Sequence, residues 1–189
     1  MSFSDDYLSE TQTILRSLDV AAIERLVAVL MATREIGGRL FILGVGGSAA
    51  NASHAVNDFR TLCGFDAYAP TDNVAELTAR TNDNGWSSTF RDWLIVSGLS
   101  ENDAVLVFSV GGGTVEASPN IMLAVRYAQL KGTSVLGIVS RDGGETAARA
   151  DAYVLVPALY PRHITPHAEV CQAVIWHLVA NHPSLRLPA

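Results

Sequence analysis

Apolar residues recur at helical spacing near the start of the chain and form short unbroken runs farther on. In the first third, this spacing predicts two helices over residues 5–17 and 19–35, the second with Asp19 as its N-cap. Gly37 and Gly38 end the second helix before a continuous apolar run, which is typical of a strand buried on both faces. Four strands are predicted, over residues 39–43, 104–109, 134–139 and 153–156.

Helical patterns fill the segments between and after these strands. The last helix has Thr165 as its predicted N-cap and Pro166 at its first position, and it stops before His182-Pro183. Strands that alternate with helices predict an α/β fold with a parallel sheet, and 189 residues fit one domain. The further helices are predicted over residues 47–62, 74–80, 88–97, 118–130, 144–148 and 165–181.

The charge balance argues against nucleic acid and membranes as partners. The formal net charge is −6, and the 13 Lys and Arg residues are spread thinly along the chain. No apolar run approaches the roughly 20 residues that span a bilayer, and the polar start lacks signal-peptide features, so we expect a cytoplasmic protein. Cys63 and Cys171 are then expected to be buried, reduced thiols. A hydrophobic content of 49% favours an oligomer that hides apolar surface.

Two glycine-rich turns follow predicted strands. The first is Gly44-Val45-Gly46-Gly47-Ser48, and the second runs from Ser109 to Thr114, with Ser118-Pro119 opening the next helix. Glycine permits positive φ and close backbone approach, and the free N–H groups of a helix N-terminus favour a phosphate. In a parallel sheet both turns lie at the carboxyl edge, where ligands bind. The first turn alone is equally compatible with glycines that serve only tight packing.

Four motifs follow one another along the chain: Gly44 to His54, Asn82-Asp83-Asn84-Gly85, Ser109 to Ser118, and Arg141-Asp142-Gly143-Gly144. In this order they resemble the SIS (sugar isomerase) domain family, and within it the sedoheptulose 7-phosphate isomerases, or phosphoheptose isomerases. The resemblance covers nearly the whole chain. It implies a three-layer α-β-α sandwich with a five-stranded parallel sheet and a homotetramer whose active sites lie at subunit interfaces. It also implies one SIS domain over residues 1–189, in which residues 1–36 form helices that pack on the domain or in the oligomer interface.

The resemblance further implies which residues bind a phosphorylated sugar. Asn82 and Asp83 would bind a sugar hydroxyl, although these residue types also cap their own backbone in turns. Val45 stands where the family usually has Asn, Val110-Gly111 replaces a Thr-Ser pair, and about four residues are inserted before the last serine of the loop. We therefore expect backbone N–H groups and three serines to hold the phosphate. The predicted phosphate-binding residues are Gly46, Gly47, Ser48, Ser109, Gly111 and Ser118.

Interconversion of a ketose phosphate and an aldose phosphate needs a base beside the carbonyl and an acid or a metal at the enediol oxygen. The family carries a histidine and a carboxylate four residues apart on the helix after the first turn. His54 and Asp58 match this spacing and share a helix face. A second pair, eight residues apart on the last helix, corresponds to Glu169 and His177 when one gap is allowed. These four residues form a set suited to zinc.

Asp58 and His177 are the predicted acid–base pair, and His54 is a metal ligand or an orienting group. Asp58 is one methylene shorter than the family's Glu. Without the gap, Ala168 and Trp176 stand at the positions of the second pair on the last helix, in place of Glu169 and His177. A His-x₃-Asp pair on a helix is also often a simple surface pair, and a histidine among apolar neighbours is often a core residue.

The sequence therefore predicts an isomerase that converts sedoheptulose 7-phosphate to D-glycero-D-manno-heptose 7-phosphate. The resemblance associates this reaction with nucleotide-activated heptose synthesis for surface polysaccharides. The alternative is a non-catalytic SIS module that binds a sugar phosphate or a protein partner in a regulatory role. The substituted catalytic positions favour that alternative.

Overall fold

A single five-stranded parallel sheet forms the centre of the protein. The structure is a computed structural model that describes residues 2–188, and its strand order is β2-β1-β3-β4-β5. Every neighbouring pair of strands is parallel. This confirms the predicted fold class. The strands are β1 (Leu40–Leu43), β2 (Ala67–Tyr68), β3 (Ala104–Ser109), β4 (Ser134–Ser140) and β5 (Ala152–Val156).

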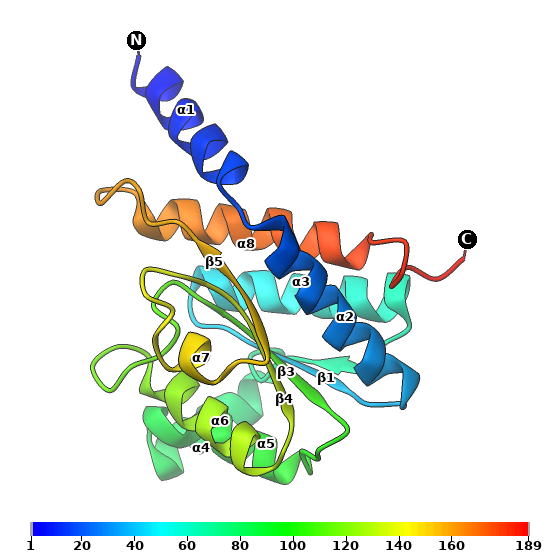
Figure 1. The fold of residues 1–189 in the computed structure, drawn as a ribbon. Coiled ribbons are helices and arrows are strands. Elements are labelled where there is room, and N and C mark those ends of the chain that lie inside the picture. Colours follow the sequence, from blue (N-terminus) through cyan, green and yellow to red (C-terminus); the bar gives the residue numbers. More distant parts are fainter. Residues whose placement is uncertain (1, 189) are drawn as a thin grey trace.

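Helices cover both faces of the sheet and create two apolar cores (Figure 1). One core packs α2, α3 and α8 against side chains such as Ile42 and Leu106, and the other packs α5 and α6 against Phe41 and Val105. Because both faces are covered, every residue of β1 and β3 is buried. The helices are α1 (Phe3–Arg16), α2 (Val20–Glu35), α3 (Gly47–Cys63), α4 (Val74–Asn84), α5 (Thr89–Val96), α6 (Pro119–Leu130), α7 (Gly144–Arg149) and α8 (Ile164–Ala180).

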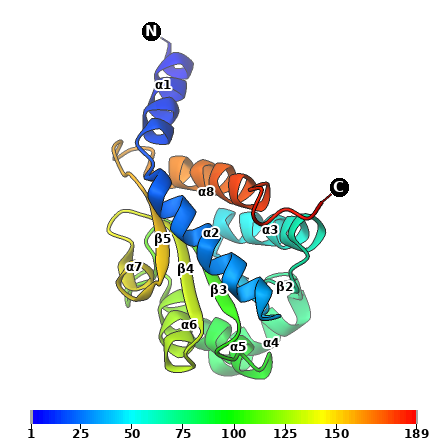
Figure 2. The same cartoon turned by 45° about the vertical axis from the view of Figure 1, so that its right-hand side comes forward.

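Of the first two helices, α2 packs on the sheet and α1 does not. α2 crosses the sheet face and buries Ile23, Leu26 and Leu30 in the core. α1 extends away from the sandwich, and Ile14 is its buried residue (Figures 1 and 2). Most of α1 therefore depends on its own capping and on contacts with the beginning of α8.

Three local features differ from the sequence-based expectations. β2 was not predicted, because a two-residue strand has no periodicity to detect, and only its pairing with β1 defines it. α8 begins at Ile164 with His163 as the N-cap, so Thr165 lies inside the first turn and does not cap the helix. α4 continues through the Asn82-Asp83-Asn84 motif until Gly85, whose φ of +80° ends it.

Both cysteines are buried and free, as expected. Burial raises the pKa of the Cys63 thiol and of the Cys171 thiol to about 11, because the apolar surroundings disfavour the thiolate. Neither thiol is a reactive nucleophile in the folded protein. Within residues 2–188, no helix combines the length and the apolar character that a membrane span requires.

Candidate functional site

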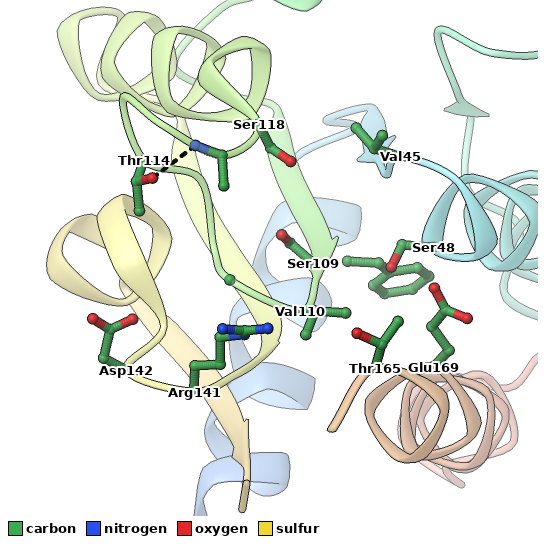
Figure 3. A pocket seen from close by; sticks show the side chains of 13 residues that line it. Val45, Ser48, Ser109, Val110, Thr114, Ser118, Arg141, Asp142, Thr165 and Glu169 are labelled. Atoms are coloured by element: carbon green, nitrogen blue, oxygen red, sulfur yellow. Dashed lines mark hydrogen bonds between the residues drawn. The ribbon is translucent and has the colours of Figure 1, made fainter. Parts of the chain in front are cut away.

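A cavity of about 510 Å³ lies at the carboxyl edge of the sheet, where the turns after β1, β3 and β4 meet the beginning of α8 (Figure 3). Its lining combines hydroxyls, two carboxylates and one guanidinium. The structure thus brings the three predicted serines to one cavity. The polar residues are Ser48, Ser109, Thr114, Ser118, Arg141, Asp142, Thr165 and Glu169, and the remaining wall consists of Val45, Phe108, Val110, Gly111 and Ala117.

The turn after β1 uses its glycines in two ways. A Cβ on Gly44 would lie 2.3 Å from the carbonyl oxygen of Ser48, so this position needs glycine for packing. Gly46 is the N-cap of α3 with φ of +63°, and Gly47 is the first helical residue. Ser48 is buried and lines the cavity beside the free N–H groups of the helix N-terminus. Glycine is therefore needed for packing in this turn, and the same turn also offers N–H groups that can bind an anion.

The turn after β3 is held in place by hydrogen bonds from α7. The N–H and hydroxyl of Thr146 donate to the carbonyl oxygen of Gly112 at 3.0 and 2.7 Å. The hydroxyl of Ser109 accepts from the N–H of Gly112 at 3.0 Å and still lines the cavity. Gly112 has φ of +68°, and a Cβ there would meet the carbonyl oxygen of Gly143. These contacts fix the loop on which Gly111 and Ser118 lie.

The inserted segment of this loop forms a small closed turn at the rim of the cavity. The N–H of Thr114 donates to the carbonyl oxygen of Ala117 at 2.7 Å, and the N–H of Ala117 donates to the hydroxyl of Thr114 at 3.0 Å. Ser118 follows with φ of +57° as the N-cap of α6. The insertion therefore adds a wall to the cavity while the last serine remains at its lining.

Arg141 and Thr165 line the cavity but were not predicted as site residues. Among the described lining residues, Arg141 is the one cation, and Figure 3 shows its side chain beside Val110. It directly follows β4, with φ of +53°. Its position after a predicted strand, at the same sheet edge as both glycine turns, was the signal that could have identified it. Thr165 was interpreted as a helix cap only.

Glu169 lies in this cavity and apart from the other three predicted zinc ligands. Its carboxylate is close to the first residue of α3, because a Cβ on Gly47 would lie 2.4 Å from Glu169 Oε2. His54, Asp58 and His177 form a separate group. The expected set of four ligands is therefore divided, because eight residues of helix between Glu169 and His177 correspond to about 12 Å of rise.

His54, Asp58 and His177 gather where α3 and α8 run side by side. Each residue offers one potential ligand atom, and these three atoms all lie within 4.8 Å of one another. His177 Nδ1 donates to the carbonyl oxygen of Ala173 at 2.7 Å, which leaves the lone pair on Nε2 in the neutral ring. Two imidazoles and one carboxylate, with one ring oriented by a backbone carbonyl, fit a zinc ion that keeps an open position.

Polar side chains connect this cluster with the cavity along the seam between α3 and α8. Asn51 lies between them in the sequence and donates to the carbonyl oxygen of Glu169 at 3.0 Å and to Gln172 Oε1 at 3.3 Å. Gln172 is buried. Ser48, Asn51 and His54 follow one another at intervals of three residues along α3, so each lies next to the following one, and the row turns from the buried side of the helix to its exposed side.

Trp176 and His177 occupy different environments. Trp176 is fully buried in the core, and its indole edge meets the ring of His54 at 4.8 Å between centroids. His177 is exposed and belongs to the ligand group. Of the two alignments left open by the sequence, the geometry favours the one that assigns His177 to the histidine position.

Asn82 and Asp83 do not reach the cavity within one chain. Both are exposed on the last turn of α4, and the Asn82 amide donates to the Asp83 carboxylate at 2.9 Å. Neither lines the cavity. The reason is that α4 continues through the motif, which the sequence suggested would be a turn. Within one chain, Asn82 and Asp83 therefore do not contact a sugar whose phosphate lies at the three serines.

The family model of the SIS domain matches residues 6–140. Together with the parallel sheet and the serine-lined cavity, this match means that the chain belongs to the SIS domain family. The resemblance found from the motifs is thereby confirmed.

The relatives of this chain include phosphoheptose isomerases of similar length. The phosphoheptose isomerase of Burkholderia pseudomallei (strain K96243) is 30% identical over 193 residues, covering 96% of this chain and 92% of that protein. That of Trichlorobacter lovleyi is 31% identical, covering 93% and 87%. The structure of the phosphoheptose isomerase of Neisseria gonorrhoeae superimposes with a TM-score of 0.80 at 25% identity, covering 94% of this chain and 95% of that chain.

Proposed function

We propose that this protein is a sugar-phosphate isomerase that converts sedoheptulose 7-phosphate to D-glycero-D-manno-heptose 7-phosphate, in the synthesis of nucleotide-activated heptose. One observation carries the proposal. Ser48, Ser109 and Ser118, which come from different strand-end turns, line a single cavity in a chain about 30% identical to phosphoheptose isomerases.

The cavity suits the phosphate end of the substrate. Two helix N-termini, those of α3 and α6, begin beside it and offer backbone N–H groups to an anion. The guanidinium of Arg141 adds a permanent positive charge in a protein of net charge −6. Because the protein as a whole repels anions, phosphate binding depends on these local donors.

The reacting end of the substrate needs a base and an acid. An extended seven-carbon sugar phosphate is about 10 Å long, judging from ordinary bond lengths. With its phosphate at the serines, the extended substrate would direct its carbonyl end along the seam toward Asp58 and His177. Asp58 lies ten residues after Ser48 on α3, about 15 Å of helix rise. We propose that Asp58 removes a proton from the carbon next to the carbonyl and returns it to the former carbonyl carbon, and that His177 transfers the hydroxyl proton between the two oxygens of the enediol. Glu169, already in the cavity, is the competing base for a bent substrate.

His54, Asp58 and His177 would hold a zinc ion, with Glu169 outside this group. A bound zinc ion would supply Lewis acidity to the carbonyl and enediol oxygens. The chain's own side chains would orient the sugar and move the proton. Metal analysis of purified wild type and of His177→Gln checks the site, and we expect one zinc per chain from this site in the wild type that the variant lacks.

A homotetramer in the cytoplasm stays a prediction. An apolar stripe on the outer face of α8 supports association, since Val170, Val174 and Leu178 are 42%, 40% and 44% exposed at intervals of four residues. Such an interface lies beside His177 and would help to exclude water from the cluster.

Substitution of Asp58 by Asn tests the reaction. We expect kcat to fall by about 10²-fold or more, because general base catalysis contributes that much, while sugar-phosphate binding persists. Conversion to the aldose heptose phosphate is measured in a coupled assay with zinc supplied, and binding is measured by calorimetry. Glu101→Gln, at the opposite edge of the sheet, is the matched control and should keep wild-type kcat.

Glu169→Gln separates the two candidate bases. If this variant loses turnover while Asp58→Asn keeps it, the base assignment is reversed and the proposed reaction stands. A wild-type protein that binds sedoheptulose 7-phosphate without any turnover would instead establish the non-catalytic module.

Arg141→Gln tests the phosphate site separately. We expect KM to rise about tenfold or more with a smaller change in kcat, because the guanidinium is distant from the reacting carbons. An unchanged KM would remove Arg141 from the site.

A further inference from the structure

A second group of potential metal ligands lies outside the cavity, between α1 and the beginning of α8. It consists of Glu10, His163 and His167, whose ligand atoms lie within 4.8 Å of one another. His163 is the N-cap of α8 and His167 lies four residues later in its first turn, with 5.8 Å between the centroids of the two rings. Glu10 approaches them from α1, about 150 residues earlier in the chain.

A single carboxylate oxygen faces both imidazoles. Glu10 Oε2 lies 2.8 Å from His163 Nδ1 and 2.8 Å from His167 Nε2. The carboxylate is therefore directed at one ring nitrogen of each histidine.

The Thr11 hydroxyl lies beside the other ring nitrogen of His167. Its oxygen is 3.3 Å from His167 Nδ1 and 3.0 Å from the carbonyl oxygen of Tyr7, to which the hydroxyl donates, so Nδ1 can carry the ring proton and donate to the hydroxyl. In that tautomer the lone pair of Nε2 faces the Glu10 carboxylate, and a metal ion can bind both atoms. With the proton on Nε2 the ring donates to Glu10 instead, so zinc binding selects the first tautomer.

Burial favours a neutral ring at this position, and a neutral imidazole is the form that binds metals. The side chain of His167 is 2% exposed, so an imidazolium there would be a charge almost completely removed from water. The ring of Tyr7 packs 4.6 Å from that of His167 and 5.4 Å from that of His163, which gives the polar group an apolar shell. A ring oriented by a hydroxyl and enclosed in this way is the arrangement that metal sites use.

We infer that Glu10, His163 and His167 bind a zinc ion that fastens α1 to α8. Two imidazole nitrogens and one carboxylate oxygen form a common zinc-ligand set. In tetrahedral coordination the ligand atoms would separate from 2.8 Å to about 3.3 Å, a small adjustment that the half-buried side chains of Glu10 and His163 can make. A cavity lined by Glu10, Tyr160, Pro161, Arg162 and His163 adjoins the group, and water there would complete the coordination. The site shares no residue with the sugar-phosphate cavity, so it does not depend on the proposed reaction.

Zinc titration of full-length protein tests the inference. The background variant is His177→Gln, which removes the first ligand group, and zinc binding is followed by calorimetry and by metal analysis after dialysis. We expect one zinc per chain in this background. Adding Glu10→Gln or His163→Gln should weaken zinc binding at least tenfold, because the first removes the carboxylate charge while keeping the shape of the side chain and the second removes one imidazole ligand. His182→Gln, which alters a histidine at the far end of α8, is the matched control and should bind zinc unchanged.

Hydrogen exchange gives a second readout that does not require the variants to be equally stable. Zinc should slow amide exchange in α1 of the background protein and should leave α1 of the Glu10→Gln variant unaffected. Tetrahedral Co²⁺ absorption bands in the background that Glu10→Gln lacks would identify the same ligands. The inference is overturned if the background protein binds no zinc, or if both ligand variants bind it as tightly as the background does.

Discussion

At the scale of single residues, Gly112 shows how strictly the phosphate loop is built. Replacement by Ala would put a Cβ 1.8 Å from the carbonyl oxygen of Gly143, at a φ of +68°. Gly37→Ala is the matched control, since its φ is +74° with no atom within 4 Å of the added Cβ. We expect the control to lose about 1–2 kcal/mol of unfolding free energy from the left-handed backbone alone. Gly112→Ala should lose clearly more, as measured by urea unfolding, and equal losses would contradict the packing argument.

At the scale of elements, Glu145 ties α7 to α6 beside the same loop. The hydrogen bond from Arg126, aided by Arg149 and opposed by burial, lowers the pKa of Glu145 from 4.5 to about 2. Because the folded-state pKa is below the unfolded one, the ion pairs stabilise the protein above about pH 4.5, and this contribution is lost as pH falls toward 2. Unfolding free energies of wild type and Glu145→Gln should therefore converge between pH 5 and pH 2. A difference that is constant with pH would show that Glu145 acts through packing instead of charge.

At the scale of the whole molecule, the exposed apolar stripe on α8 predicts how chains associate. Val174→Asp, with Val170→Asp as a second variant, should convert the expected tetramer to smaller species in light scattering coupled to size exclusion. The buried charge would have no partner in the interface. Leu130→Asp is the control, because Leu130 is 85% exposed at the end of α6, away from the stripe. A tetramer that survives both α8 substitutions would place the interface elsewhere.

Sequence and structure agree most closely where burial alone defines an element. The central strands were predicted within one or two residues, because runs such as Leu40–Leu43 are apolar throughout. β2 was missed, since Ala67 and Tyr68 become a strand only by pairing with Leu40 and Phe41. Ser48, Ser109 and Ser118 were found through glycine turns. Arg141 was missed although it directly follows a predicted strand, because its guanidinium joins the serines only in the folded cavity.

The sequence by itself determined the α/β architecture, the family and the two glycine turns, because hydrophobic period and glycine chemistry act over a few neighbouring residues. The tertiary structure alone decided which distant side chains meet. It brought Glu169 into the cavity and away from His177, since a straight helix keeps residues eight apart on different turns. It also brought Glu10 to His163 and His167, which no spacing along the chain could have indicated, because that contact depends on how α1 leaves the sandwich and meets α8.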